Sequence, residues 1–442
     1  MEAIDTLIHA RWVIPVEPAG TVLEDFSLAV RDGRIVDLLP AAAARARYQA
    51  ATVVELPEHA LIPGLVNAHT HAAMSLFRGL ADDLPLMEWL GKHIWPAESR
   101  WVRAEFVRDG TLLAVAEMLR GGTTCFNDMY FFPDEAAFAA TQAHIRAVVG
   151  LILIDFPTAW AGNAEDYLHK GLEVHDQLRH NPLLHTAFAP HAPYTVSDAP
   201  LERVSVLAEE LDIPVHMHVH ETAHEVQQSL AERGERPLAR LHRLGLVSPR
   251  LLAVHMTQVE EEDLRLLAEA GASVAHCPES NLKLASGFCP VQRLADAGIN
   301  VALGTDGAAS NNDLDLLGEM RTAALLAKGV AGDATAVSAA DALRMATLNG
   351  ARALGLEEEI GSLVPGKAAD AVAVRLSDLE TEPVYHPLSQ LVYANVRDRV
   401  SDVWVAGRHV LKEGVLTTLD APALVARARE WGRRIGAANS GR

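Results

Sequence analysis

Cysteine is scarce in this sequence of 442 residues, and long apolar runs are missing. The three cysteines, Cys125, Cys277 and Cys289, cannot build a disulfide framework, and none of them lies in a CxxC pair. The longest apolar run, Ala147–Ile154, is far shorter than the roughly 18 residues of a membrane-spanning helix. The Met1–Val13 segment lacks the basic region and apolar core of an export signal. These absences predict a protein of the reducing cytoplasm with no membrane partner.

The sequence also has fewer basic than acidic residues and lacks the common phosphate-binding motifs. The chain has 38 Lys and Arg residues against 58 Asp and Glu residues, which gives a formal net charge of −20. A surface of that sign repels polyanions, so nucleic acid is not an expected partner. The sequence contains neither GxGxxG nor GxxxxGK[ST], the loops that would indicate a nucleotide-binding, doubly wound sheet. It also lacks the PCxxC site of cytidine-deaminase-type zinc enzymes.

What the sequence does contain is a repeated strand-then-helix pattern between about residues 60 and 306. Helical periodicity follows several apolar segments, for example at Leu201, Val204 and Leu207. Near-continuous apolar strands are typical of parallel sheets buried on both faces, so we expect a distorted (β/α)8 TIM barrel, with an open doubly wound sheet as the alternative. The eight predicted strands are Leu61–Ala68, Thr123–Asp128, Val148–Ile154, Leu184–Ala189, Pro214–Val219, Leu251–His255, Ser273–Cys277 and Val301–Gly304.

The two ends of the chain have a different pattern of short alternating strands and turns. Thr21–Val30 and Arg34–Leu39 flank a turn, and Pro365-Gly366 leads into further strands. We therefore predict three segments: residues 1–58 and 366–442 form a small β-sandwich-like module, and residues 59–365 form the barrel. A helix over about Ala421–Ile435 is expected to pack on the outside.

Metal-binding side chains recur where the predicted barrel strands end. His69 and His71 end the first strand two residues apart, on one face, so both can reach a single ion. His255 ends the sixth strand, and Asp306 follows the eighth. On the fifth strand His216, His218 and His220 share a face, and spacing alone does not choose among them. Because the carboxyl ends of barrel strands form active sites, this joint placement predicts a metal centre.

Read one at a time, these residues have simpler explanations. A lone HxH pair is a weak signal, His255 could merely end a strand, and Asp306 fits a turn with Thr305 and Gly307. Together, three imidazoles and a carboxylate suit zinc and leave room for a water molecule, although iron or manganese could use the same ligands. Zinc lowers the pKa of such a water to about 7, and Asp306 is placed to accept its proton.

The chain resembles the amidohydrolase superfamily over nearly its whole length. The resemblance implies a distorted (β/α)8 barrel, hydrolytic chemistry, and a metal bound by His69, His71, His218 and Asp306. The fourth strand offers neither a lysine nor a glutamate to bridge a second metal, so one zinc ion is expected. Two stretches carry the resemblance: Leu61 to His71 (LIPGLVNAHTH) and Gly361 to Asp370 (GSLVPGKAAD).

Within that superfamily the chain is most similar to the 5′-methylthioadenosine/S-adenosylhomocysteine deaminases. The resemblance implies that Glu98 holds the ribose hydroxyls, His191 contacts the purine, Glu221 serves purine nitrogen 1, and His255 polarises the attacking oxygen. Asp306 would contact the substrate as well as the metal. The stretches that carry it are Trp95 to Glu98, Ala189 to Tyr194, His218 to Thr222, and His276 to Ala285.

The expected reaction is hydrolysis of adenine to a 6-oxo purine with release of ammonia, for which a carboxylic acid must protonate nitrogen 1. Gly150–Gln177 contains no arginine, whereas Phe156, Pro157 and Trp160 offer an apolar wall. An unpaired carboxylate would be costly there, which favours 5′-methylthioadenosine, with S-adenosylhomocysteine or adenosine as further substrates.

Three matters stay open at this stage. The barrel could act on another heterocycle, as guanine deaminases and triazine chlorohydrolases do, or serve as an inactive scaffold. A homo-oligomer is compatible with the sequence. The Asp82–Pro85 stretch could form a lid over the substrate or a contact between subunits.

Overall fold

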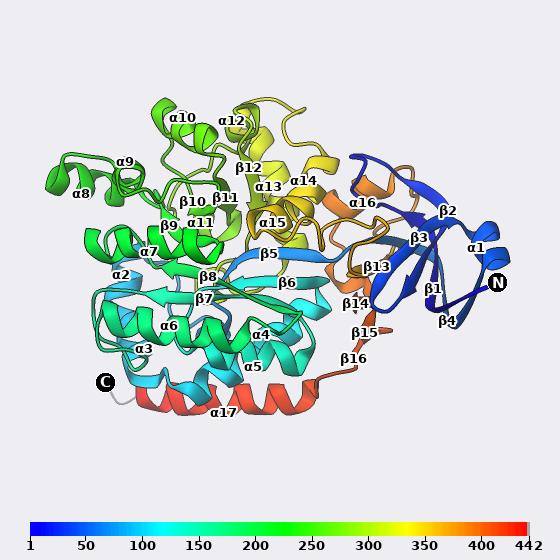
Figure 1. Cartoon of the computed structure of the whole chain (residues 1–442), viewed down its shortest axis with the longest axis horizontal. Helices are drawn as coiled ribbons and strands as arrows, with labels where there is room; N and C mark the ends of the chain where they lie inside the picture. Colours follow the sequence, from blue (N-terminus) through cyan, green and yellow to red (C-terminus); the bar gives the residue numbers. More distant parts are fainter. Residues whose placement is uncertain (440–442) are drawn as a thin grey trace. The chain divides into compact units, whose positions relative to one another are not determined.

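The computed structural model describes residues 1–439 and contains two sheets there, each of eight strands (Figure 1). The first sheet has the order β16-β15-β14-β13-β4-β1-β2-β3 and is antiparallel except for the β1–β4 pair. Its strands are β1 (Glu2–Val13), β2 (Leu23–Arg31), β3 (Arg34–Pro40), β4 (Tyr48–Pro63), β13 (Ala371–Arg375), β14 (Val400–Val405), β15 (Arg408–Lys412) and β16 (Val415–Leu416). The two ends of the chain thus build one β module, as predicted.

The second sheet is the predicted (β/α)8 barrel, with its strands side by side in chain order and parallel. A backbone hydrogen bond of 3.0 Å from the Asp306 amide to the His69 carbonyl joins the chain after the last strand to the first strand. The strands are β5 (Leu65–Thr70), β6 (Thr123–Asp128), β7 (Arg146–Leu153), β8 (Leu184–Pro190), β9 (Val215–Val219), β10 (Leu251–His255), β11 (Ser273–His276) and β12 (Asn300–Leu303).

Each of the eight predicted barrel strands is present, but the first one is wrong at its start. The predicted Leu61–Ala68 strand is two strands: β4 ends at Pro63, β5 begins at Leu65, and Gly64 separates them. Leu61 and Ile62 pair with β13 in the terminal sheet instead. A Cβ at Gly64 would lie 1.9 Å from Oγ1 of Thr124, so only glycine lets the backbone pass this point.

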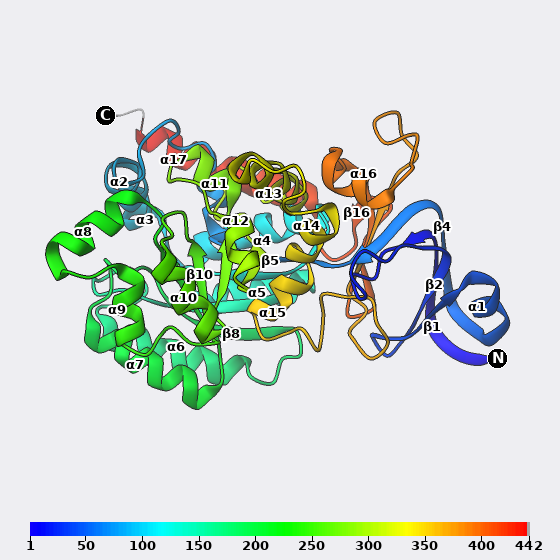
Figure 2. The ribbon, with the colours of Figure 1, turned by 90° about the horizontal axis from the view of Figure 1, so that it is seen from above.

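Helices separate the barrel strands, and Figure 2 shows α6 to α9 along one flank of them. Within the barrel region the helices are η1 (Ala72–Phe77), α2 (Leu86–Glu88), η2 (Trp89–Ile94), α3 (Trp95–Trp101), α4 (Ala104–Arg120), α5 (Pro133–Ala143), α6 (Ala164–Leu178), α7 (Asp198–Leu211), α8 (Ala223–Arg233), α9 (Pro237–Arg243), α10 (Glu261–Ala270), α11 (Pro278–Lys283) and α12 (Val291–Asp296). The others are α1 (Ala41–Arg47), α13 (Leu316–Ala331), α14 (Ala339–Met345), α15 (Leu348–Ala353), α16 (Pro387–Tyr393), η3 (Arg397–Arg399) and α17 (Ala421–Asn439).

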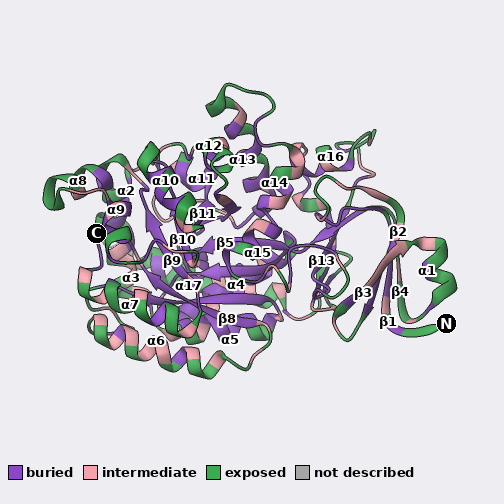
Figure 3. Ribbon diagram, turned by 45° about the horizontal axis from the view of Figure 1, so that its top comes forward, coloured by how far each residue is buried: buried purple, intermediate pink, exposed green. Residues whose placement is uncertain are grey.

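Burial follows the barrel pattern, with the strands buried and the helices exposed on one side (Figure 3). Every residue of β5, β6 and β7 is buried, whereas α7 buries Leu201, Val204, Leu207 and Ala208 and exposes its other face. This is the arrangement that a parallel sheet needs when helices cover it. No helix among residues 1–439 is long and apolar enough to cross a membrane.

The chain divides into two compact units. One comprises residues 1–67, 117–125 and 315–418, and the other comprises residues 68–116, 126–314 and 419 onward. All the candidate site residues named from the sequence belong to the second unit. The domain boundaries after residues 58 and 365 stay a prediction.

Candidate active site

Four of the predicted ligands come together at the carboxyl end of the barrel. His69 is the last but one residue of β5, His71 follows that strand, His218 lies on β9, and Asp306 follows β12. One ligand atom from each lies within 4.8 Å of the other three. Nε2 of His69 is 3.2 Å from Oδ1 of Asp306 and 3.2 Å from Nε2 of His218, and Nε2 of His71 is 3.3 Å from the same Oδ1.

Hydrogen bonds on the far side of two imidazoles leave their Nε2 atoms free to bind a metal. Nδ1 of His71 donates to the Met129 carbonyl at 2.6 Å, and Nδ1 of His218 donates to the His191 carbonyl at 2.8 Å. A carbonyl can only accept, so each Nδ1 carries the proton and each Nε2 carries a lone pair when the ring is neutral. Such bonds orient metal-ligating histidines in proteins.

Two serines hold the carboxylate of Asp306. Its Oδ2 accepts hydrogen bonds from the hydroxyls of Ser280 at 2.6 Å and Ser310 at 2.8 Å, which leaves Oδ1 facing the histidines. Burial alone would raise the pKa of Asp306, but hydrogen bonds and charge from His69 and His71 hold that pKa well below its usual range. Asp306 is therefore ionised at neutral pH.

The donor set fits a cation. The lone pair of His218 faces His69, and the carboxylate of Asp306 faces His69 and His71, so electron-rich atoms converge on one point. Burial lowers the pKa of His69 to about 4. For His71 the hydrogen bond and charge of Asp306 outweigh burial and raise the pKa to about 9, which marks a place where positive charge is favoured. Three imidazoles and one carboxylate are a donor set typical of zinc.

The other histidines of β9 lie elsewhere, which answers the question that spacing left open. Nε2 of His216 lies 2.7 Å from Nδ1 of His69, behind the ligand cluster. Nδ1 of His220 lies 3.1 Å from the Gln258 carbonyl, and its Nε2 accepts a hydrogen bond from the Leu238 amide. Of the three, His218 alone belongs to the cluster of ligand atoms among the described residues.

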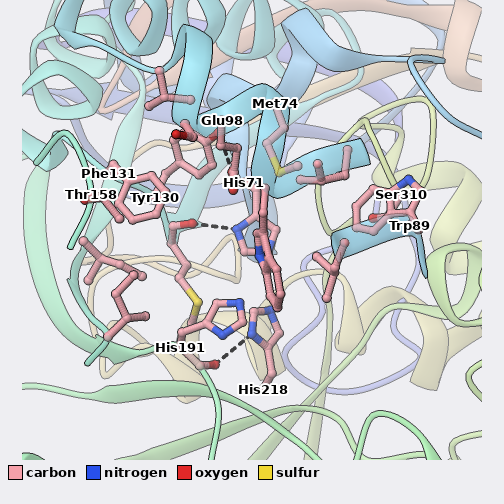
Figure 4. Close-up of a pocket in the computed structure, with 18 of the residues that line it drawn as sticks. His71, Met74, Trp89, Glu98, Tyr130, Phe131, Thr158, His191, His218 and Ser310 are labelled. Carbon is pink, nitrogen blue, oxygen red and sulfur yellow. Dashed lines mark hydrogen bonds between the residues drawn. The ribbon is translucent and has the colours of Figure 1, made fainter. Parts of the chain in front are cut away.

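A cavity of about 530 Å³ opens beside this cluster (Figure 4). Its wall includes His71, His218 and Asp306 from the cluster together with Glu98, His191, Glu221 and His255, so every residue predicted to bind substrate reaches it. Much of the remaining wall is apolar, and includes Met74, Trp89, Phe131, Ile152 and Phe156. A mainly apolar cavity with a few convergent polar groups is typical of a small-molecule site.

Glu221 and His255 lie together on this wall. Oε2 of Glu221 is 3.9 Å from Nε2 of His255, whose Nδ1 donates to Oδ1 of Asn281 at 2.8 Å. Burial raises the pKa of Glu221. Glu225 holds the turn in place, because its carboxyl accepts hydrogen bonds from the amides of His220 and Glu221. A carboxyl group with a raised pKa can act as a proton donor.

Glu98 lies on another part of the wall, in α3. The Tyr130 hydroxyl donates to its Oε1 at 2.8 Å, and burial raises the pKa of Glu98 to about 7. His191, at the start of the loop after β8, bonds through Nδ1 to the hydroxyl of Thr195 at 3.1 Å. Burial lowers the pKa of His191 to about 3, so its ring is neutral.

The segment after Asp82 forms part of the cavity wall. Leu86, Trp89 and Ile94 line the cavity, and Asp82 makes an ion pair of 2.6 Å with Lys283 of α11. The Asp82–Pro85 stretch itself is not among the residues that line the cavity, and its role as a lid or as a contact between subunits stays a prediction.

Sequence reasoning missed several residues of the site. Ser280, Ser310 and Tyr130 contact predicted residues from distant elements. Ser280 lies within the His276 to Ala285 stretch that carries the resemblance, but no role was predicted for it. Arg103 also lines the cavity, and it lies outside the Gly150–Gln177 segment that lacks arginine. The signal in the sequence is its position five residues after Glu98.

Comparisons with known proteins agree with this geometry. Residues 60–410 match the model of the amidohydrolase family. The chain is 52% identical to a 5-methylthioadenosine/S-adenosylhomocysteine deaminase of Saccharophagus degradans, over 98% of this chain and 97% of that protein. A crystal structure of an adenosine deaminase from Xanthomonas campestris with bound zinc has a TM-score of 0.98 and 59% identity, and covers 99% of both chains.

More distant structures share the fold. A mutant atrazine chlorohydrolase from Arthrobacter aurescens, complexed with zinc and atraton, has a TM-score of 0.90 at 24% identity, over 96% of this chain and 99% of that one.

Proposed function

Because this chain belongs to the amidohydrolase family, we propose that it is a zinc-dependent hydrolytic deaminase of adenine nucleosides, with 5′-methylthioadenosine as its main substrate. The products are the 6-oxo purine nucleoside and ammonia. The observation that carries the proposal is the cluster of His69, His71, His218 and Asp306 at the wall of a cavity that also presents Glu98 and Glu221. The names of the relatives with 52% and 59% identity support the same chemistry.

One metal ligand, Asp306, is also proposed to accept a proton from the reacting water. Zinc, when bound by these four residues, lowers the pKa of a water molecule to about 7 and so supplies a nucleophile at neutral pH. Asp306 is ionised and accepts the proton that the water loses. Ser280 and Ser310 keep its carboxylate aimed at the cluster during this transfer.

Glu221 acts on the purine ring, and His255 acts on the attacking water. Addition of water to carbon 6 builds negative charge on nitrogen 1 of the purine, and the carboxyl of Glu221 donates a proton there. Its raised pKa keeps the donor form available. His255, whose Nδ1 proton is bonded to Asn281, orients and polarises the attacking oxygen through Nε2.

Glu98 and His191 hold the nucleoside. The ionised carboxylate of Glu98 accepts hydrogen bonds from the two ribose hydroxyls, and Tyr130 fixes its orientation. The neutral ring of His191 contacts the purine. Both residues line the cavity that contains the proposed acid Glu221.

The cavity wall proposed to contact the 5′ substituent has both apolar side chains and one cationic side chain. Ile154, Phe156 and Pro157 offer apolar contacts that suit a methylthio group. Arg103 lies on the wall of the same cavity and can pair with the carboxylate of S-adenosylhomocysteine. We therefore propose 5′-methylthioadenosine as the preferred substrate and S-adenosylhomocysteine as an additional one.

The setting of this activity is also a proposal. The three cysteines are buried as thiols, which supports a reducing cytoplasm. The net charge of −20 supports a small nucleoside rather than a nucleic acid as the partner.

A nucleoside panel tests the proposal. The purified protein is incubated with 5′-methylthioadenosine, S-adenosylhomocysteine, adenosine, guanine and a chlorotriazine, with and without a chelator, while ammonia and chloride are measured. The proposal expects ammonia from the adenine nucleosides, fastest from 5′-methylthioadenosine, and loss of turnover with chelator. Turnover of guanine or chlorotriazine alone would assign the barrel to another heterocycle, and no turnover by zinc-loaded protein would favour a scaffold.

A further inference from the structure

His216 lies behind the metal cluster and contacts one of its ligands directly. It is fully buried on β9, and its Nε2 lies 2.7 Å from Nδ1 of His69. The two rings meet edge to face, with centroids 4.8 Å apart. His216 does not line the substrate cavity, so contact with His69 is what it can contribute to the site.

The partner of His69 differs in kind from the partners of the other two histidine ligands. His71 and His218 each donate Nδ1–H to a backbone carbonyl, which can only accept. Nε2 of His216 can either donate or accept, depending on where its own proton lies. The tautomer of His69 is therefore decided jointly with that of His216.

Only one arrangement of protons lets His69 bind a metal through Nε2. In that arrangement Nδ1 of His69 carries the proton and donates it to Nε2 of His216. His216 then carries its own proton on Nδ1, an atom that is buried and has no hydrogen-bond partner among residues 1–439. In the opposite arrangement Nε2–H of His216 donates to His69, and Nε2 of His69 is blocked by a proton that faces Asp306 at 3.2 Å.

We propose that His216 is a positioning residue of the metal centre: its Nε2 accepts the Nδ1 proton of His69 and holds His69 in the tautomer whose Nε2 can bind zinc. The inference rests on the zinc site of the proposed function. It assigns to a neutral histidine a task that backbone carbonyls perform for the other two ligands.

Zinc affinity measured by chelator competition tests the inference on the full chain. His216→Phe keeps the ring but removes the acceptor, and we expect zinc affinity to fall about 10- to 100-fold. His216→Gln places an amide oxygen where Nε2 lies and should restore affinity to within about threefold of the original chain. His276→Phe is the matched control, because His276 is also a buried barrel histidine, 1% exposed. It should leave zinc affinity unchanged.

A second measurement does not depend on the Phe variant folding. In ¹⁵N-histidine spectra of the zinc-loaded original chain, one metal-bound ring should show a protonated Nδ1 whose signal moves in His216→Gln. Unchanged zinc affinity in a folded His216→Phe, or an unprotonated Nδ1 on His69, overturns the inference. If the original chain binds no zinc, the proposed function fails; if it binds zinc and the variants match it, only this inference fails.

Discussion

The pKa values of three buried carboxyl groups of the site shift in different directions because their neighbours differ. Asp306 has two histidines beside one oxygen and two serine hydroxyls on the other, so its pKa is low. For Glu221 burial raises the pKa more than the nearby His255, His71 and Ser286 lower it. Burial raises the pKa of Glu225 to about 8. The split supplies a base and an acid within one cavity.

Replacement of Glu221 by glutamine removes the proposed acid and keeps its shape. We expect kcat for 5′-methylthioadenosine to fall about 10²- to 10⁴-fold, because proton donation to nitrogen 1 is lost. Zinc content should stay at that of the original chain, since Glu221 is not among the clustered ligand atoms. Steady-state kinetics and metal analysis check this. A variant with near-normal kcat would assign the acid to another group.

Substrate binding should depend on pH through Glu98. Its pKa is raised to about 7, so the carboxylate that accepts the ribose hydroxyls is lost as pH falls through 7. We expect KM for 5′-methylthioadenosine to rise as pH falls from 8 to 6, and Glu98→Gln to have a high KM that no longer varies with pH. A KM that stays constant in the original chain contradicts this role.

Arg103 provides a test of the 5′ side of the cavity. Arg103→Ala should lower kcat/KM for S-adenosylhomocysteine about 10- to 100-fold, the scale of a lost charge-assisted contact. The value for 5′-methylthioadenosine, which has no carboxylate, should change little. Competition between the two nucleosides measures the ratio directly. Equal losses on both substrates would mean that Arg103 supports the wall and does not recognise charge.

At the scale of elements, the sequence predicts the ends of strands better than the contacts that cross the barrel. The HxH spacing at the end of β5 and the apolar run before His255 are local patterns, so they place His69, His71 and His255 correctly in the fold. The choice of His218 over His216 depends on the position of β5 relative to β9, which the spacing of the histidines does not contain, and only the resemblance to the amidohydrolases supplied it. Ser280, Ser310 and Tyr130 were missed for the same reason.

Gly64, between β4 and β5, is a position where a single added methyl group should lower the stability of the fold. Gly64→Ala places a Cβ within 1.9 Å of Thr124, and we expect the free energy of unfolding to fall by about 1–3 kcal/mol. Gly432→Ala in α17 is the control, because a Cβ there meets no atom within 4 Å and helix propensity favours alanine. Urea unfolding of both variants checks the difference, and equal midpoints would contradict the close approach.

At the scale of the whole molecule, one compact unit carries every residue of the proposed site, and its four ligands come from segments far apart in the chain. An ion that binds only this folded arrangement stabilises it. Removal of zinc should therefore lower the thermal unfolding temperature of the original chain. It should not do so in Asp306→Ala, which has lost a ligand. Differential scanning calorimetry with and without chelator measures this, and equal shifts in both proteins would place the stabilising metal elsewhere.

Titration of zinc into metal-free protein, with ammonia release from 5′-methylthioadenosine as the signal, tests the central claim most directly. The account predicts no turnover before zinc is added, a linear rise, and a break at one equivalent per chain. Full turnover by the metal-free protein, or none at any zinc concentration, would contradict it.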